Sequence, residues 1–224
     1  MALPLSDYLP FWSRLTPDEQ QSIAQNTTLH EIKKGTILHN GNEDCVGLLV
    51  VTKGQLRAFT RSAEGKEMTL YRLFERDICL FSASCILNSI VFDLSVSAEQ
   101  DSTLYRIPSD LYRAMMQQSP AVANFTNELM AQRFSDVMWL FDQVMNKRMD
   151  SRLAALLAEE SELAGREELK ITHDELARHL GTAREVVTRM LKYLQAEGAV
   201  TLSRGGVRIA DREKLLRLAQ ESLR

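Results

Sequence analysis

The sequence predicts an α+β protein: an N-terminal antiparallel β-roll or jelly roll, one long helix, and a C-terminal helical domain with a β-hairpin. Three observations predict this fold class. Short β-rich runs alternate with turn residues between Leu29 and Pro108, and a helical pattern fills most of residues 109–146. Two short helices and a hairpin follow Ile171. Strands that are segregated from helices along the chain are typical of α+β proteins.

The N-terminal region begins with a helix signal and continues as strands. Thr16 precedes Pro17 and two acidic residues, which is the pattern of an N-cap, a first-turn proline and charges that suit the positive helix end. Turn residues separate the expected strands, which are Thr28–Ile32, Thr36–Leu38, Gly47–Val51, Gln55–Thr60, Glu67–Leu73, Leu94–Ala98 and Ser102–Ile107. We predict an effector-sensing β-roll domain over residues 1–119.

Residues 120–146 predict one long helix with two apolar stripes. The stripes are Leu129, Val137, Leu140 and Val144, and Met130, Phe134, Met138, Phe141 and Met145. A helix packed on its own domain needs one stripe, so a second stripe indicates a partner helix. We expect a homodimer with Leu129, Val137, Leu140 and Val144 at the interface. The alternative is a helix that is buried all round in a monomer.

Residues 171–195 have the layout of a helix-turn-helix. Thr172 and Glu175 have capping-box spacing, and Gly181 stands where the first helix would end. The second helix is expected from Ala183 to Gln195, with one apolar face. Its opposite face carries Arg184, Glu185, Thr188 and Arg189. In a helix-turn-helix the second helix enters the DNA major groove with such side chains. An ordinary helical hairpin with a charged face is the alternative.

A β-hairpin is expected directly after these helices. Val200 and Leu202 alternate with Val207 and Ile209 around a Gly-Gly turn. The combination predicts a winged helix domain over residues 150–224, with a hinge near Met145–Asp150. Arg204 and Arg208 would place positive charge on the wing near DNA phosphates.

The segment Ile171–Ile209 resembles the DNA-binding domain of the CRP/FNR transcription regulators, and the rest of the chain resembles that family in order and length. Arg184, Glu185 and Arg189 match the base-reading positions of the family's recognition helix. The resemblance implies a bacterial homodimer on an inverted-repeat operator with TGTGA-like half-sites, and RNA polymerase is a further candidate partner. The expected phosphate contacts are Thr172, His173, Thr182, Arg204 and Arg208.

The turns of the β region resemble those of cyclic-nucleotide-binding domains, but the ligand-binding positions differ. Arg76-Asp77 replaces the family's ribose-binding Gly-Glu pair, and Phe92-Asp93 replaces its phosphate-binding Arg-Ser pair. An aspartate repels a phosphate, so we expect no cyclic AMP and an unidentified effector.

The remaining pocket should be mostly apolar, with serines that could hold a small anionic group. Its expected lining residues are Met68, Leu70, Cys79, Leu80, Phe81, Ser82, Ser84, Cys85, Met138 and Trp139. The alternative is a pocket filled by its own side chains. Cys79 and Cys85 admit a redox interpretation, although buried inert thiols are the commoner case.

Composition limits the function classes. The chain is 45% hydrophobic and 25% charged with a net charge of −3, yet residues 166–224 hold 12 Lys/Arg against 9 Asp/Glu. DNA affinity depends on such a local basic face. We expect a cytoplasmic protein without a membrane segment, because no signal-peptide pattern or run of about 18 apolar residues occurs. Three cysteines without ligand spacing predict no metal.

These features predict a sequence-specific DNA-binding transcription regulator whose dimer is controlled by a small effector or a redox signal. No phosphate loop, metal signature or paired-carboxylate pattern indicates an enzyme, and no histidine neighbours Cys79 or Cys85 as a nucleophile's base. The alternative function is an effector-binding interaction module whose winged helix contacts protein. Salt-dependent duplex binding separates the two.

Overall fold

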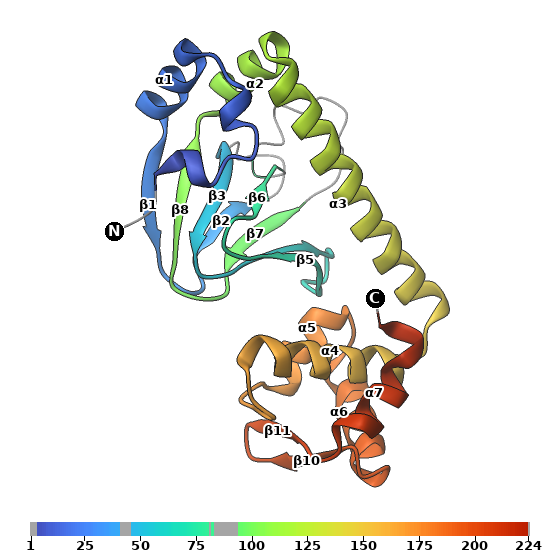
Figure 1. Cartoon of the computed structure of the whole chain (residues 1–224). Coiled ribbons are helices and arrows are strands. Elements are labelled where there is room, and N and C mark those ends of the chain that lie inside the picture. Colours follow the sequence, from blue (N-terminus) through green and yellow to red (C-terminus); the bar gives the residue numbers. More distant parts are fainter. Residues whose placement is uncertain (1–3, 41–45, 81, 83–93, 224) are drawn as a thin grey trace. The chain divides into compact units, whose positions relative to one another are not determined.

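The computed structural model describes residues 4–40, 46–80, 82 and 94–223, which Figure 1 draws in colour. The chain divides into two compact units. The first comprises Met1–Arg61 and Leu70–Val137, and the second comprises Ser62–Thr69 and Met138–Arg224. No helix among the described residues is both long and apolar enough to span a bilayer.

The first unit contains two four-stranded sheets, ordered β1-β8-β3-β6 and β2-β7-β4-β5. Pairings recorded in both sheets are antiparallel. The strands are β1 (Thr28–Ile32), β2 (Ile37–Asn40), β3 (Leu48–Lys53), β4 (Leu56–Arg61), β5 (Glu67–Leu73), β6 (Ile78–Cys79), β7 (Ser95–Ala98) and β8 (Ser102–Ile107). The predicted β-roll is confirmed. β6 was not predicted, because two residues are too few to show an alternating pattern.

Helices cover the first unit. They are α1 (Pro17–Asn26), α2 (Ser109–Gln118) and the first part of α3 (Pro120–Asn146), with short 3-10 helices η1 (Leu5–Asp7) and η2 (Trp12–Arg14). The expected cap of α1 is present, since Thr16 Oγ1 accepts from Glu19 N at 3.3 Å. One apolar cluster joins residues of both sheets, including Leu49, Val51 and Leu73. A second cluster packs the helices on the sheets.

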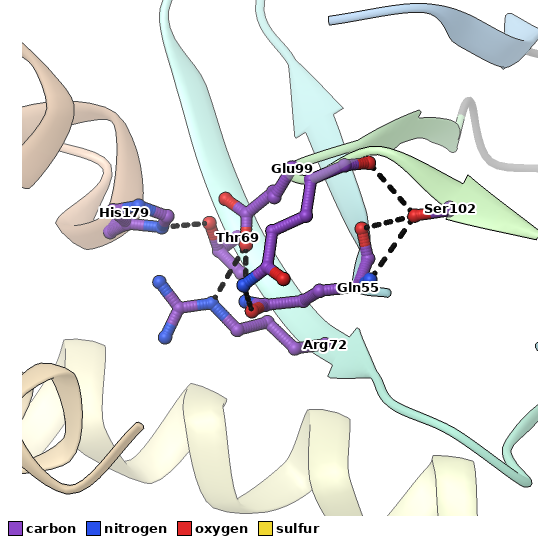
Figure 2. Close-up of polar contacts among 7 residues, drawn as sticks. Gln55, Thr69, Arg72, Glu99, Ser102 and His179 are labelled. Carbon is purple, nitrogen blue, oxygen red and sulfur yellow. Dashed lines mark hydrogen bonds and ion pairs between the residues drawn. The ribbon is translucent and has the colours of Figure 1, made fainter. Parts of the chain in front are cut away.

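A polar network links separate segments of the roll (Figure 2). Gln55 Nε2 donates to Glu99 Oε2 at 2.7 Å, and Arg72 Nε donates to the same oxygen at 3.0 Å. Ser102 Oγ accepts from the backbone N–H of Gln55 at 3.2 Å. The network joins the turn before β4, strand β5 and the turn between β7 and β8, and this linkage holds their register.

The described surface of α3 carries an exposed apolar stripe. Its large members are Phe134, Met138, Phe141, Val144 and Met145, of which Phe134 is 68% exposed. Leu129, which we predicted at a dimer interface, is only 7% exposed and packs in the core of the first unit. That prediction is corrected at Leu129, because the start of α3 already buries this side chain against its own chain. Val137 and Leu140 are half-buried.

The second unit is a helical domain with a small sheet. Its elements are α4 (Met149–Ala164), β9 (Glu168–Leu169), α5 (His173–Leu180), α6 (Arg184–Ala196), β10 (Val200–Ser203), β11 (Gly206–Ile209), α7 (Arg212–Ala219) and the 3-10 helix η5 (Gln220–Ser222). The sheet order is β10-β11-β9. One apolar cluster holds the domain together, with Leu153, Leu176 and Leu191 fully buried. The predicted helix pair and hairpin are present.

The hairpin turn differs by one residue from the predicted Gly-Gly turn. Ser203 pairs with Gly206, so Arg204 and Gly205 form the turn. Gly205 has a φ of +80°, a conformation that glycine adopts without strain. Gly206 already belongs to β11, and a Cβ there would lie 2.8 Å from the Leu169 carbonyl oxygen. Gly206 therefore permits the close approach of β9.

Candidate nucleic-acid interface and sensor site

The turn between α5 and α6 is built as the sequence predicts. Glu175 N donates to Thr172 Oγ1 at 3.2 Å, and Thr172 N donates to Glu175 Oε2 at 2.7 Å. Gly181 ends α5 with a φ of +67°. The Thr172 hydroxyl also donates to Glu175 Oε2 at 2.8 Å. The side chain of Thr172 thus caps the helix. This corrects the prediction that Thr172 contacts a DNA phosphate.

α6 has one buried face and one exposed charged face. Val187 and Leu191 are fully buried in the domain core. Glu185 and Arg189 are exposed, and their spacing of four residues places them together on the side opposite the buried residues. Arg184 is exposed at the first position of the helix. The structure thus brings together the three side chains that we predicted as base readers.

Arg184 also has a partner within the domain. Its Nη1 lies 3.5 Å from Asp174 Oδ2 at the start of α5, and both side chains are 63% exposed. An exposed ion pair at this distance contributes little, because water screens it and two side chains must be ordered. Arg184 can leave Asp174 for a nucleic acid at small cost.

Thr188 and His173 form a polar link between α6 and α5. Thr188 Oγ1 donates to the Arg184 carbonyl at 2.9 Å, and His173 Nδ1 lies 2.9 Å from the same hydroxyl. Because the hydroxyl proton is already used, the arrangement requires Nδ1 to carry a hydrogen and donate. Both residues are half-buried. They hold the angle between the helices rather than extend into solvent.

Arg152 is a buried arginine whose contact with the helix-turn-helix the sequence analysis did not predict. It is 8% exposed, and its Nη2 donates to the Leu180 carbonyl at 2.9 Å, at the end of α5. Burial lowers the pKa of this guanidinium. In the same unit, His179 Nδ1 lies 2.9 Å from Thr69 Oγ1 (Figure 2). An arginine within the apolar face of α4 was the available signal for Arg152.

The hairpin presents two exposed arginines. Arg204 lies in the turn, and Arg208 lies on β11 opposite Thr201 of β10. Glu168 of β9 is the other register partner of Arg208. A neighbouring carboxylate lowers the positive potential there, so Arg204 is the stronger cationic position of the wing. Thr182, also predicted near phosphate, is half-buried.

Several residues that we predicted to line the sensor pocket belong to the packed interior of the first unit. Cys79 and Leu80 are almost fully buried, and Leu70 packs on the cluster between the sheets. Ser82 is also fully buried, with its Oγ 2.7 Å from the Gly47 carbonyl oxygen and 2.8 Å from that of Cys79. Its hydroxyl hydrogen is committed to these carbonyls. The prediction that Ser82 holds an anionic ligand is therefore corrected.

The other predicted pocket residues belong to the second unit or lie outside the described residues. Met68, Met138 and Trp139 belong to the second unit, and Met138 is 47% exposed. Phe81, Ser84 and Cys85 lie outside the described residues, as does the Phe92-Asp93 pair. Within the described residues, no group of three or more His, Cys, Asp or Glu is placed to hold a metal.

The first unit contains a polar cluster that we did not predict. Arg133 of α3 donates from Nη1 to Asp136 Oδ2 at 3.0 Å, and their side chains are 8% and 12% exposed. The guanidinium carbon lies 4.5 Å from the ring centroid of Tyr71 on β5. Burial raises the pKa of the Tyr71 hydroxyl well above its usual value, and neighbouring Cys79 adds to the effect. Tyr71 is therefore a neutral phenol.

The loop before β6 has a non-glycine residue in a backbone conformation that glycine usually adopts. Arg76 has a φ of +75°, which is the left-handed region that glycine favours. The Asp77 carboxylate accepts from the Phe74 N–H at 2.8 Å. The Arg76-Asp77 pair thus builds the turn, and the Asp77 carboxylate is committed to the backbone.

A β-roll, a long helix and a winged helix-turn-helix with exposed arginines together define the class of DNA-binding transcription regulators. Comparisons with known proteins agree. Residues 29–119 match the cyclic nucleotide-binding domain, and residues 151–218 match the Crp-like helix-turn-helix domain. The crystal structure described as a transcriptional regulator of the Crp/Fnr family from Eubacterium rectale is 52% identical, with a TM-score of 0.94, covering 96% of this chain and 99% of that chain. The chain belongs to the CRP/FNR family of transcription regulators.

Two relatives from Thermus thermophilus extend the comparison. The cyclic AMP receptor protein is 29% identical over 172 residues, which are 77% of this chain and 79% of that protein. A CRP/FNR-family transcriptional regulator of known structure is 24% identical with a TM-score of 0.70, covering 86% of this chain and 98% of that chain. The second likeness shows the fold.

Proposed function

We propose that this protein is a homodimeric regulator that binds an inverted-repeat DNA operator through α6 and responds to a small effector in its β-roll. The observation that carries the proposal is the exposed surface of α6, which holds Arg184, Glu185 and Arg189. In the chain, α6 follows the capped helix α5 and its glycine turn. An α-helix with such residues fits the major groove.

The chemistry of this face favours particular bases. Arg184 and Arg189 have the length and the planar donor fork to take guanine O6 and N7, and Glu185 can accept from cytosine N4. A half-site like TGTGA provides these bases. We reassign Thr188, first expected to contact DNA, as a positioning residue, because its hydroxyl binds the Arg184 carbonyl and His173.

Phosphate contacts would set the register of the dimer on DNA. Arg204 at the tip of the wing and Arg208 behind it are exposed cations that can reach the backbone. His173 and Thr182 lie beside the reading helix and supply further polar atoms. RNA polymerase is the partner that a DNA-bound transcription regulator would contact.

The experiment is selection from random duplexes by the full-length protein, followed by titration at several salt concentrations. We expect enrichment of an inverted repeat with half-site centres about one helical turn apart. We also expect the logarithm of the affinity to fall linearly with the logarithm of the salt concentration. No enriched sequence and no salt-dependent duplex binding would favour a winged helix that contacts protein.

The exposed stripe of α3 is the proposed dimer surface. Phe134, Phe141 and Met145 are more than half exposed, and burying such a stripe between two copies is the usual way to remove large side chains from water. Phe141→Glu should place a charge in the interface and shift the protein toward monomer in analytical ultracentrifugation. Glu128→Gln, on an exposed position outside the stripe, is the control. A Phe141→Glu variant that stays dimeric places the interface elsewhere.

We further propose that cyclic AMP is not the effector. In support, the position of the family's ribose-binding glycine holds Arg76, and Asp77 next to it is bonded to the backbone of its own turn. Calorimetry with cyclic AMP should show no saturable binding at micromolar concentrations. Micromolar binding contradicts the proposal.

A further inference from the structure

The base of the wing, where β10 begins and β11 ends, is tied to neighbouring backbone. Ile209 N, at the end of β11, donates to the Glu167 carbonyl just before β9 at 2.9 Å. Ala210 N and Asp211 N both donate to the Ala199 carbonyl just before β10, at 3.0 and 3.2 Å. The chain that leaves the wing is thus bonded to the segments that enter β9 and β10.

Arg212 adds a side-chain connection to this base. It is the first residue of α7, directly after the wing. Its Nη2 donates to Glu162 Oε1 at 2.8 Å, and its Nη1 lies 3.3 Å from both Glu167 Oε1 and Ser161 Oγ. One guanidinium therefore joins α7 to the end of α4 and to the turn that leads to β9. We call these four residues the Arg212 network.

The same turn supports the third strand of the wing sheet. Ser161 is 3% exposed, and its hydroxyl also lies 3.3 Å from Glu167 Oε2. Glu167 directly precedes β9, which pairs with β11 through Leu169 and Val207. The Arg212 network therefore connects the strand that supports the wing with the chain that leaves it.

Exposure limits what this network contributes. The side chains of Arg212, Glu162 and Glu167 are 37%, 67% and 47% exposed, so water screens the pairs and they add little to global stability. The wing needs little, because a two-stranded hairpin is marginally stable by itself and β9 adds only two residues. Local opening also takes less free energy than global unfolding. A contribution that is small for the domain therefore decides how often the base of the wing opens.

Movement at the base becomes larger at the tip. Each wing strand has four residues, which span about 13 Å. A rotation of about 10° at the base would move Arg204 in the turn by about 2 Å, which breaks a hydrogen bond of about 2.9 Å. Arg208 lies nearer to the base and moves less. The position of Arg204 thus depends most on how firmly the base is held.

We infer that Arg212 is a positioning residue for the wing: it holds the base of β10 and β11 against the end of α4 and thereby places Arg204 at a DNA phosphate. The inference rests on the proposed function and adds to it a residue that acts on DNA through another residue. Phosphate contacts are alike on all sequences, whereas base contacts are not. Arg212 should therefore set affinity and leave sequence preference to α6.

The first test is titration of the full-length protein with the selected operator and with an unrelated duplex at several salt concentrations. Arg212→Met removes the ion pairs and keeps a long side chain. Arg217→Met is the matched control, because it removes the same charge from α7, where Arg217 lies 3.7 Å from Glu213 of its own helix.

We expect Arg212→Met to weaken binding to both duplexes by the same factor. The slope of the logarithm of affinity against the logarithm of salt concentration should flatten by up to about 0.9, the value for one phosphate contact. Arg217→Met should keep the wild-type slope. Equal slopes for the two variants overturn the inference, as does a loss that is confined to the operator.

The double variant Arg204→Ala/Arg212→Met separates positioning from direct contact. It should bind DNA as Arg204→Ala does, because the contact that Arg212 sets is already absent, and coupled residues are not additive. Losses that add in the double variant would mean that Arg212 contacts DNA itself, which contradicts the positioning role.

Amide hydrogen exchange measured by NMR without DNA tests the network independently of binding. Arg212→Met should speed exchange of the Ile209 amide by about two- to fivefold, which corresponds to a network of exposed ion pairs. The Thr182 amide, bonded to the Ala177 carbonyl at 3.0 Å in the turn after α5, should exchange as in the wild type. Unchanged exchange at Ile209, or equal acceleration at Thr182, overturns the inference.

Failure of the regulator proposal is recognised separately. Absence of duplex binding by the wild-type protein contradicts the proposed function, and the role of Arg212 in DNA binding with it. Duplex binding by the wild type together with unchanged Ile209 exchange in Arg212→Met contradicts the positioning role alone.

Discussion

Two arginine–aspartate pairs lie in the two units, and they differ in burial. Arg184 and Asp174 beside the reading helix are each 63% exposed and 3.5 Å apart. Arg133 and Asp136 beside the β-roll core are 8% and 12% exposed and 3.0 Å apart. The same two groups are thus placed once in water and once in the protein interior.

The difference in burial determines what each arginine can do. Water screens the exposed pair, so separating it costs little and leaves Arg184 available for a base edge. The buried pair has lost its hydration, and its attraction is stronger at low dielectric. Separating Arg133 from Asp136 would therefore leave two charges without hydration or a partner. The exposed pair separates at small cost, and the buried pair does not.

The largest expected effect comes from breaking the buried pair on one side. Arg133→Met leaves the Asp136 carboxylate buried without its cation, and we expect the free energy of unfolding to fall by roughly 3 kcal/mol. Urea denaturation at a fixed protein concentration measures it. The matched control is the double variant Arg133→Met/Asp136→Leu, which should recover most of the loss. A single variant as stable as the wild type would show that the pair is not desolvated.

The smallest effect is expected from the exposed pair. Asp174→Ala should change the free energy of unfolding by no more than about 0.5 kcal/mol, because an exposed pair contributes little. The same urea titration measures it. A loss comparable to that of Arg133→Met would erase the contrast between the two pairs.

The fold could be predicted because its local signals are strong and agree with one another. The Thr172–Glu175 capping box, the positive φ of Gly181 and the alternation in the hairpin each act within a few residues. β6 and β9 could not be predicted, since each has two residues and forms only through pairing with distant strands.

The candidate sites show the same division. The exposed face of α6 follows from helical periodicity alone, so Arg184, Glu185 and Arg189 were predicted together. Arg133 was missed because it contacts Tyr71, which is far away in the sequence. Helical periodicity does not predict such a contact. Leu129 was assigned to the wrong surface for a similar reason. An apolar stripe does not say whether its own chain or a partner covers it.

The most direct test of DNA reading by α6 is titration of wild type and Arg189→Ala against the selected operator and against duplexes with single base-pair changes. We predict that Arg189→Ala loses about 1–3 kcal/mol of binding free energy on the operator. We also predict that this loss largely disappears on the duplex whose contacted guanine is already replaced. An equal loss on every duplex, without a base-specific signature, would contradict the claim that α6 reads the DNA sequence.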